Sequence, residues 1–119
     1  CDYTKTEKGA FDISEQALGG IEHSILFINR NLENSLTLDE VAREANMNRS
    51  YFCTVFKRLN GMSPWEYITI KRIEKAVDLL KTTDSTMIEI AGMCGFNNTS
   101  NFNRAFKKVT GRIPKHYRK

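Results

Sequence analysis

The sequence predicts an all-α fold of about seven helices in which one structural unit occurs twice. Apolar residues recur at spacings of three and four along most of the chain, as on one face of a helix, and we find no convincing strand. Residues that cap helices precede several of these apolar runs. The stretch SYFCTVFKRLNGMSPWEYI (50–68) also resembles SNFNRAFKKVTGRIPKHYR (100–118). Together these features predict the helices, their boundaries and a duplication.

The first half of the chain predicts three helices after a polar arm. Residues 1–20 are polar and end in two glycines, so we expect a linker or a flexible N-terminal arm. Thr37 and Glu40 form a capping-box pair that opens a short second helix, and a third helix over about 49–59 ends at Gly61. The first helix is predicted by four apolar residues at helical spacing, namely Ile21, Ile25, Ile28 and Leu32.

The second half predicts a long helix and then the short-helix pattern again. Ser63, Pro64 and Glu66 supply an N-cap, a proline at the first helical position and a capping-box glutamate. The long helix carries an apolar face and is expected to end within residues 82–84. Three segments follow, namely a short helix capped by Thr86 and Glu89, a helix over about 99–109 that ends at Gly111, and one turn over 113–117.

The two similar stretches belong to a repeated helix-turn-helix. At an offset of fifty residues, seven of nineteen paired positions are identical. Each copy has a short helix, a corner at Asn46 or Gly95, and a longer helix, and both corner residue types tolerate the positive φ that a sharp corner often requires. We therefore expect a first unit at 21–62, a linker helix at 63–83 and a second unit at 84–119.

The longer helix of each unit has an apolar side and a polar side. At 100° per residue, the residues predicted to enter the core are Phe52, Val55, Phe56 and Leu59, and in the copy Phe102, Ala105, Phe106 and Val109. The residues predicted to point away are Ser50, Cys53, Thr54 and Lys57, and in the copy Ser100, Asn103, Arg104 and Lys107. Such a face fits a DNA major groove, because asparagine and arginine pair with base edges and lysine with phosphates. The alternative is a polar face that contacts only solvent.

The charges are distributed unevenly along the chain. The formal net charge is +4, yet residues 1–34 hold three basic and six acidic side chains, whereas residues 35–119 hold fifteen and eight. From residue 98 to the end there are seven basic residues and no acidic one. This asymmetry is typical of a surface that meets nucleic acid, and a solvated lysine-rich face is the alternative.

Other classes of protein find little support in the sequence. No apolar run approaches the roughly 18 residues that span a bilayer, and the start lacks a signal pattern, so we expect no membrane partner and a cytoplasmic, nucleoid-associated location. The three cysteines Cys1, Cys53 and Cys94 form no metal-binding spacing, and only two histidines are available, so we expect neither metal nor cofactor. No nucleophile has a placed base, and therefore we do not expect an enzyme.

Three strings in the chain resemble the DNA-binding domain of the AraC/XylS family of bacterial transcription regulators. They are LxxVA…YF…FK…G.SP..Y over 38–67, R…A..LL over 72–80, and I.EIA…GF…S.F.R.FK..TG..P..YR over 88–118. The resemblance covers about residues 21–118. It implies two helix-turn-helix subdomains whose recognition helices enter successive major grooves of double-stranded DNA. The eighteen residues of the linker over about 64–81 would span roughly 27 Å, near the roughly 34 Å between such grooves, so a modest DNA bend is expected.

The resemblance also implies which residues contact bases. The matching positions are Arg49, Ser50, Cys53 and Thr54 in the first unit and Ser100, Asn101, Asn103 and Arg104 in the second. Family members often have an arginine where this chain has Thr54, the counterpart of Arg104. The first helix therefore has less capacity for a bidentate contact with guanine and relies on Arg49, thymine methyl groups or backbone contacts.

Further residues are assigned from their face and charge. The candidates for phosphate contacts are Lys57, Arg58, Lys107, Lys108 and Arg112, each with simple solvation as its alternative. We expect Cys94 to fill the core as a small apolar residue. Trp65 is expected in the core or in packing along the linker helix, because it shares a stripe with aliphatic residues.

The leading functional hypothesis is a sequence-specific DNA-binding module of a transcription activator that recruits RNA polymerase. Because the chain begins at Cys1 with a linker-like stretch, we expect a C-terminal fragment of a larger, effector-responsive regulator. We expect this fragment to be monomeric and the full protein to dimerise, if it does, through a missing N-terminal domain. The alternative is a helical module that binds an acidic protein, which competition with DNA or heparin would distinguish.

Overall fold

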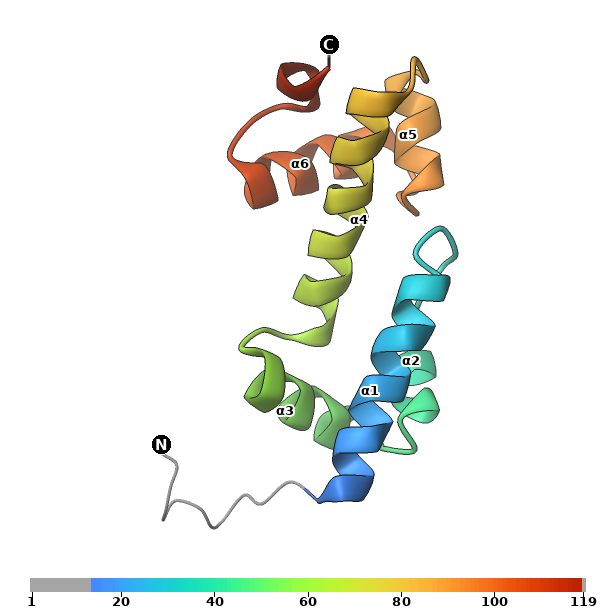
Figure 1. The fold of residues 1–119 in the computed structure, drawn as a ribbon, viewed down its shortest axis with the longest axis vertical. Helices are drawn as coiled ribbons and strands as arrows, with labels where there is room; N and C mark the ends of the chain where they lie inside the picture. Colours follow the sequence, from blue (N-terminus) through green and yellow to red (C-terminus); the bar gives the residue numbers. More distant parts are fainter. Residues whose placement is uncertain (1–13, 119) are drawn as a thin grey trace.

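A computed structural model describes residues 14–118 of the chain. Within that range the secondary structure consists of six α-helices and one 3-10 turn, with no strand, as the sequence predicts. The helices form two lobes at opposite ends of an elongated molecule, and α4 runs from one lobe into the other (Figure 1). The two lobes are the two copies of the repeated unit.

The first lobe contains α1 (Glu15–Arg30), α2 (Leu38–Glu44) and α3 (Arg49–Asn60). Helix α1 packs against both α2 and α3. The buried core of this lobe consists of Ile21, Ile28, Leu36, Val41, Ala42, Ala45, Phe52, Val55, Phe56 and Ile68. Ile68 comes from α4, and the other nine residues come from the helices and loops of the first lobe.

The second lobe contains α4 (Pro64–Thr82), α5 (Met87–Met93), α6 (Thr99–Thr110) and the 3-10 turn η2 (Pro114–Tyr117). Its buried core consists of Ile73, Ala76, Leu80, Ile90, Ala91, Cys94, Phe102 and Phe106. Helix α4 therefore contributes to both cores, and in the second lobe it occupies the place that α1 has in the first.

Local sequence signals set most helix boundaries. Complete capping boxes open three helices, with Thr37, Ser63 and Thr86 as the N-caps. Both long helices of the repeat end at a glycine in the left-handed conformation, with φ 75° at Gly61 and 81° at Gly111. These glycines and caps lie where the sequence predicts them.

The corners between the short and long helices also have the predicted geometry. Asn46 has φ 59° and is the only residue other than glycine with a positive φ among residues 14–118. Gly95, its counterpart in the second lobe, has φ 89°. Left-handed backbone is easily reached by glycine and better tolerated by asparagine than by most residues. The helix-turn-helix therefore occurs twice, as predicted.

Helix α1 begins earlier than the sequence predicts. The predicted arm extends to Gly20, but Ser14 caps a helix that starts at Glu15, so 15–20 are helical. Gly20 is needed for packing rather than for a linker, because a Cβ at this position would lie 2.6 Å from the carbonyl oxygen of Ala45. The remainder of the predicted arm, 1–13, lies outside the described residues.

Three residues that we expected in the core or in helix packing are exposed over more than a third of their surface. The exposed fractions are 40% for Leu59, 37% for Val109 and 45% for Trp65. Leu59 and Val109 have the predicted direction around the helix axis but lie in the last turn of α3 and α6. Helical periodicity gives the direction of a side chain but not the point along the axis at which the neighbouring helix ends. Trp65 and Val109 line a shallow groove between α4 and α6.

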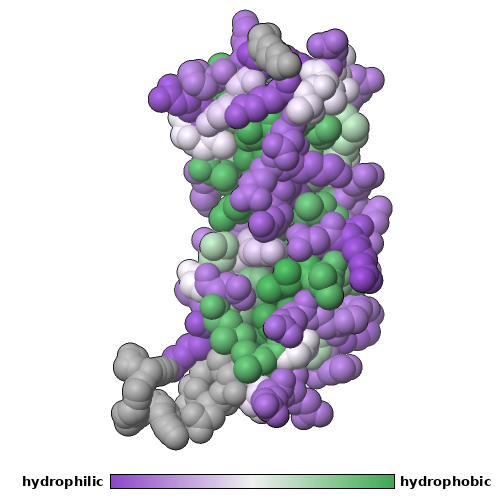
Figure 2. Space-filling model, in the orientation of Figure 1, coloured by the Kyte–Doolittle hydropathy of each residue, from purple (hydrophilic) through white to green (hydrophobic). Residues whose placement is uncertain are grey.

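The exposed hydrophobic residues are spread over several helices. Figure 2 shows hydrophobic patches on one face that are interrupted by hydrophilic residues. The large hydrophobic side chains with the greatest exposure in the described chain are Leu18, Leu26, Tyr51, Leu59, Trp65, Ile88, Val109 and Ile113. Trp65 and Val109 share one groove, and scattered exposure of the remaining residues is normal on a protein surface.

Candidate nucleic-acid interface

The two helices predicted to contact DNA, α3 and α6, are called the recognition helices below, and both start with the same hydrogen bond. The side-chain oxygen of Asn48 accepts from the backbone N–H of Tyr51 at 2.8 Å, and that of Asn98 accepts from the backbone N–H of Asn101 at 2.8 Å. Sequence analysis did not identify these two N-caps, although asparagine directly before a helical run is a recognised signal. The caps fix the first turn of each helix, where four of the predicted base-contacting positions lie.

The same aromatic cluster lies beneath both helices. In the first lobe the rings of Phe52 and Phe56 are 5.6 Å apart between centroids, and Tyr67 is 5.5 Å from Phe56. The corresponding rings in the second lobe are Phe102, Phe106 and Tyr117, at 5.7 and 5.5 Å. Five of the seven identities in the repeat, these three aromatic positions together with glycine and proline, therefore have a structural role. The outward faces are free to differ between the two helices.

On α3 the outward face is only partly polar, and its first residue, Arg49, supplies the charge at its start. Arg49, Ser50 and Thr54 are exposed, whereas Cys53 is half-buried and packs against the core of the first lobe. The Thr54 hydroxyl donates to the carbonyl oxygen of Ser50 at 3.0 Å. We expected Cys53 to point away from the core, and its half-burial corrects that expectation. Its thiol lies at the edge between the core and the outward face.

On α6 the outward face is fully polar. Ser100, Asn101, Asn103 and Arg104 are all exposed. The Arg104 guanidinium donates to the side-chain oxygen of Asn101 at 3.2 Å, one helical turn away. This contact holds the guanidinium over the first turn of the helix. Asn103 and Arg104 of α6 thus occupy the positions at which α3 has the half-buried Cys53 thiol and the Thr54 hydroxyl.

The predicted phosphate-contacting residues are also at the surface. Lys57, Arg58, Lys107, Lys108 and Arg112 are all exposed. The pKa of Glu66 is lowered by hydrogen bonds from the backbone and hydroxyl of Ser63, and further by the positive charges of Lys57 and Lys108. One lysine from each recognition helix therefore lies near the start of α4, so these parts of α3 and α6 face the same region of the surface.

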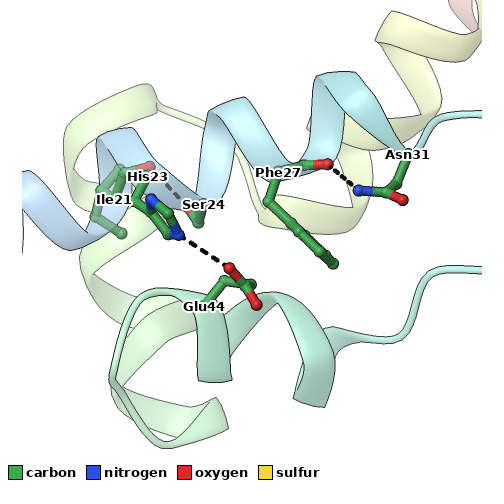
Figure 3. Close-up of polar contacts among 6 residues, drawn as sticks. All are labelled: Ile21, His23, Ser24, Phe27, Asn31 and Glu44. Atoms are coloured by element: carbon green, nitrogen blue, oxygen red, sulfur yellow. Dashed lines mark hydrogen bonds and ion pairs between the residues drawn. The ribbon is translucent and has the colours of Figure 1, made fainter.

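His23 and Cys94 each contact other parts of the protein. His23 of α1 points toward α2 and forms a 2.9 Å contact with Glu44, and Ser24 and Asn31 donate to carbonyl oxygens of α1 itself (Figure 3). Cys94 is buried as expected, and burial raises the pKa of its thiol to about 11. Among residues 14–118, no group of histidine, cysteine and acidic side chains is arranged to hold a metal ion. Nor is any helix in that range long and apolar enough to cross a bilayer.

Known proteins share this arrangement. A family model described as a helix-turn-helix domain matches residues 41–119, more than half of the chain. The chain is 36% identical over 99 residues to the TetD protein of transposon Tn10 from Escherichia coli. The matched segment covers 83% of this chain and 72% of that protein. The chain belongs to the AraC/XylS family. It is an AraC-type DNA-binding domain of a transcription regulator.

Two further AraC-type comparisons place this domain among larger regulators and known folds. The chain is 32% identical over 116 residues to the melibiose operon regulatory protein of Escherichia coli K12, matching 98% of this chain but only 38% of that protein. The DNA-binding domain of AdpA, solved in complex with a target DNA, superposes with a TM-score of 0.78 at 26% identity, over 82% of this chain and 88% of that one. The two-lobed AraC-type fold is thus shared with a domain that binds DNA.

Proposed function

We propose that α3 and α6 contact two boxes of one DNA site in successive major grooves. The observation that carries the proposal is the repeated construction of the two helices. Each begins at an asparagine N-cap, ends at a left-handed glycine and rests on the same three aromatic rings. Both present their exposed polar residues on the side opposite those rings. The two helices are supported in the same way but have different polar faces. Each is therefore suited to bind a similar DNA box of different sequence.

The base contacts are proposed for the eight positions on these faces. They are Arg49, Ser50, Cys53 and Thr54 on α3, and Ser100, Asn101, Asn103 and Arg104 on α6. Arg104 offers the two parallel donors that match guanine, and asparagine matches adenine in the same bidentate way. Among the four positions proposed on α3, only Arg49 offers a guanidinium. We therefore propose that α6 provides most of the sequence specificity and that α3 contributes less of it.

The phosphate contacts are proposed for Lys57, Arg58, Lys107, Lys108 and Arg112. Lys57 and Lys108 lie near the same carboxylate at the start of α4, although they come from different lobes. If both recognition helices lie in major grooves of one DNA, the phosphates between the two boxes would pass this region. Contacts of this kind position the protein and make its affinity depend on salt, without selecting a sequence.

A further proposal concerns the role of the whole regulator in transcription. We propose that the domain serves an activator that recruits RNA polymerase at a promoter, in the bacterial cytoplasm and in association with the nucleoid. The piece described here is proposed to act as a monomer, because both recognition helices lie in one chain. We propose no catalytic activity for it.

Selection of bound sequences from a random double-stranded DNA library tests the proposal. At about 150 mM salt, non-specific phosphate binding is weakened and specific contacts dominate the selection. Enrichment of an asymmetric site with two boxes about one helical turn apart supports both helices as readers. A single box means that only one helix specifies sequence, and α6 is the expected one. Absence of enrichment contradicts the proposal and favours binding to an acidic protein instead.

A further inference from the structure

One buried cation lies in the middle of α4. Arg72 is only 6% exposed, and burial lowers the pKa of its guanidinium. A buried guanidinium is costly to desolvate unless its donors are satisfied by well-placed acceptors. Its burial between two apolar cores therefore calls for an explanation in terms of the contacts it makes.

The guanidinium of Arg72 binds the loop that follows α1 in the first lobe. Its Nε donates to the carbonyl oxygen of Leu32 at 3.1 Å, and its Nη2 donates to that of Asn34 at 3.0 Å. The planar guanidinium presents both donors in a fixed geometry, so two such bonds hold both the position and the direction of the loop. One turn along α4, Lys75 reaches Glu33 of the same loop at 3.4 Å, in an exposed contact that adds little.

Gly95 and Phe96 of the second lobe also contact Arg72 and the loop that it binds. A Cβ at Gly95 would lie 2.1 Å from the carbonyl oxygen of Leu32 and 2.9 Å from Nε of Arg72. The helix-turn-helix corner of the second lobe is therefore packed directly against the loop of the first. The Phe96 ring is 6.0 Å from the guanidinium, within the range of a cation–π contact. We call these five residues, Leu32, Asn34, Arg72, Gly95 and Phe96, the Arg72 joint.

The second lobe has a matching arginine clasp that stays within one lobe. Arg118 donates to the carbonyl oxygen of Thr83 at 2.7 Å and also to that of Ser85. The loop over 83–86 precedes α5 just as the loop over 31–37 precedes α2. Both arginines thus bind two carbonyls that are two residues apart, but only Arg72 connects the lobes. Arg118 is therefore a matched control for Arg72.

We propose that the Arg72 joint fixes the relative orientation of the two recognition helices and thereby sets the spacing between DNA boxes that the chain accepts. Helix α4 is one attachment between the lobes, with Ile68 in the first core and Ile73 in the second. The stretch of α4 between the two cores can still bend and twist, and a second contact away from the helix axis restrains both motions. Arg72 is a positioning residue, because it acts through the loop and the corner. The link to box spacing rests on the proposed function.

The DNA test compares spacers between the two boxes. One added or removed base pair rotates the boxes by about a tenth of a turn and shifts them by about 3.4 Å. For the wild-type chain we expect about tenfold weaker binding with either change, which is roughly one lost base contact. For Arg72→Met we expect weaker binding to the optimal spacer and less than about threefold variation among spacers. Arg118→Met is expected to lower the unfolding temperature but to keep the wild-type dependence on spacer length.

A DNA-free measurement tests the joint independently. Spin labels on cysteines introduced at Glu22 in α1 and Lys107 in α6, both exposed, in a Cys1→Ser, Cys53→Ser background, report the distance between the lobes by pulsed electron paramagnetic resonance. We expect a narrow distribution in the parent and in Arg118→Met, and a broad one in Arg72→Met. Arg72→Lys keeps the charge but not the paired donors, so we expect it to broaden the distance distribution too. This variant replaces Arg72→Met in the experiment if the methionine variant does not fold.

The outcomes separate the two proposals. Narrow distances in a folded Arg72 variant overturn the joint, as does an unchanged spacer dependence in such a variant. Broad distances in the Arg118 variant also overturn it, because the effect would then be general destabilisation. If the wild-type chain selects only one box or no sequence, the proposed function fails, while the distance measurement still decides whether Arg72 holds the lobes together.

Discussion

Replacing Arg104 with alanine removes the only arginine of α6 and tests the assignment of that helix to DNA. Its guanidinium is exposed and donates to Asn101 at 3.2 Å, between two surface side chains. Loss of such a contact changes the free energy of unfolding by no more than about 0.5 kcal/mol. A loss of affinity can therefore be attributed to the missing DNA contact rather than to unfolding.

The expected size of the effect follows from the two donors of arginine. A bidentate pair with guanine contributes about 1–3 kcal/mol of discrimination, which corresponds to a roughly 5- to 150-fold weaker Kd. The matched control is Thr54→Ala at the equivalent position of α3, where the hydroxyl already donates to the Ser50 carbonyl. We expect this control to weaken binding by less than about threefold.

The assay is a titration of the selected site and of its single-base variants at about 150 mM salt. If Arg104 contacts a base, the alanine variant loses affinity for the optimal site and no longer distinguishes the bases at one position. An equal loss on every sequence, with a salt slope smaller by about 0.9, would show instead that Arg104 contacts a phosphate. Unchanged binding to all sequences would refute the placement of α6 in the groove.

Three further predictions concern the supports of the interface. Phe106→Ala removes a fully buried ring between Phe102 and Tyr117 and is expected to reduce the free energy of unfolding by about 3–5 kcal/mol, measured by urea titration; a loss below about 1 kcal/mol would contradict the aromatic support. Asn98→Ala removes the N-cap of α6 and should cost about 1 kcal/mol, whereas Asn98→Asp should retain most of the stability, and equal losses in both variants would argue against the cap. Because burial raises the pKa of Cys94 from 9.0 to about 11, the folded state favours the neutral thiol, so its contribution is complete below pH 9 and is lost as the pH rises to about 11. Cys94→Ala should make the unfolding free energy fall less steeply across that window, and an identical slope in both proteins would contradict the burial of the thiol.

The sequence predicts those features of the fold that depend on neighbouring residues. The capping boxes at Thr37, Ser63 and Thr86 and the corners at Asn46 and Gly95 each require only a few adjacent residue types. The predicted outward faces are likewise exposed in the structure except for Cys53, because 100° per residue determines direction around a helix. Whether these exposed residues contact DNA stays a prediction.

Features that depend on distant segments could not be predicted in the same way. The exposure of Leu59 and Val109 depends on where the packed neighbours of α3 and α6 end. The helical place of Gly20 accompanies its close approach to Ala45, which lies 25 residues later. The burial of Arg72 depends on two partners that are 40 and 38 residues away in the sequence. Such contacts follow from the tertiary arrangement and not from local patterns.

The sharing of α4 by two cores has a consequence for how the chain melts. Ile68 belongs to one core and Ile73 to the other, with little more than one helical turn between them. Unwinding α4 from one end exposes the apolar core of the lobe at that end. It also shortens the helix that contributes to the core of the other lobe. Native-state hydrogen exchange of the α4 amides should therefore be as slow as global unfolding, and heat should melt both lobes in a single cooperative transition.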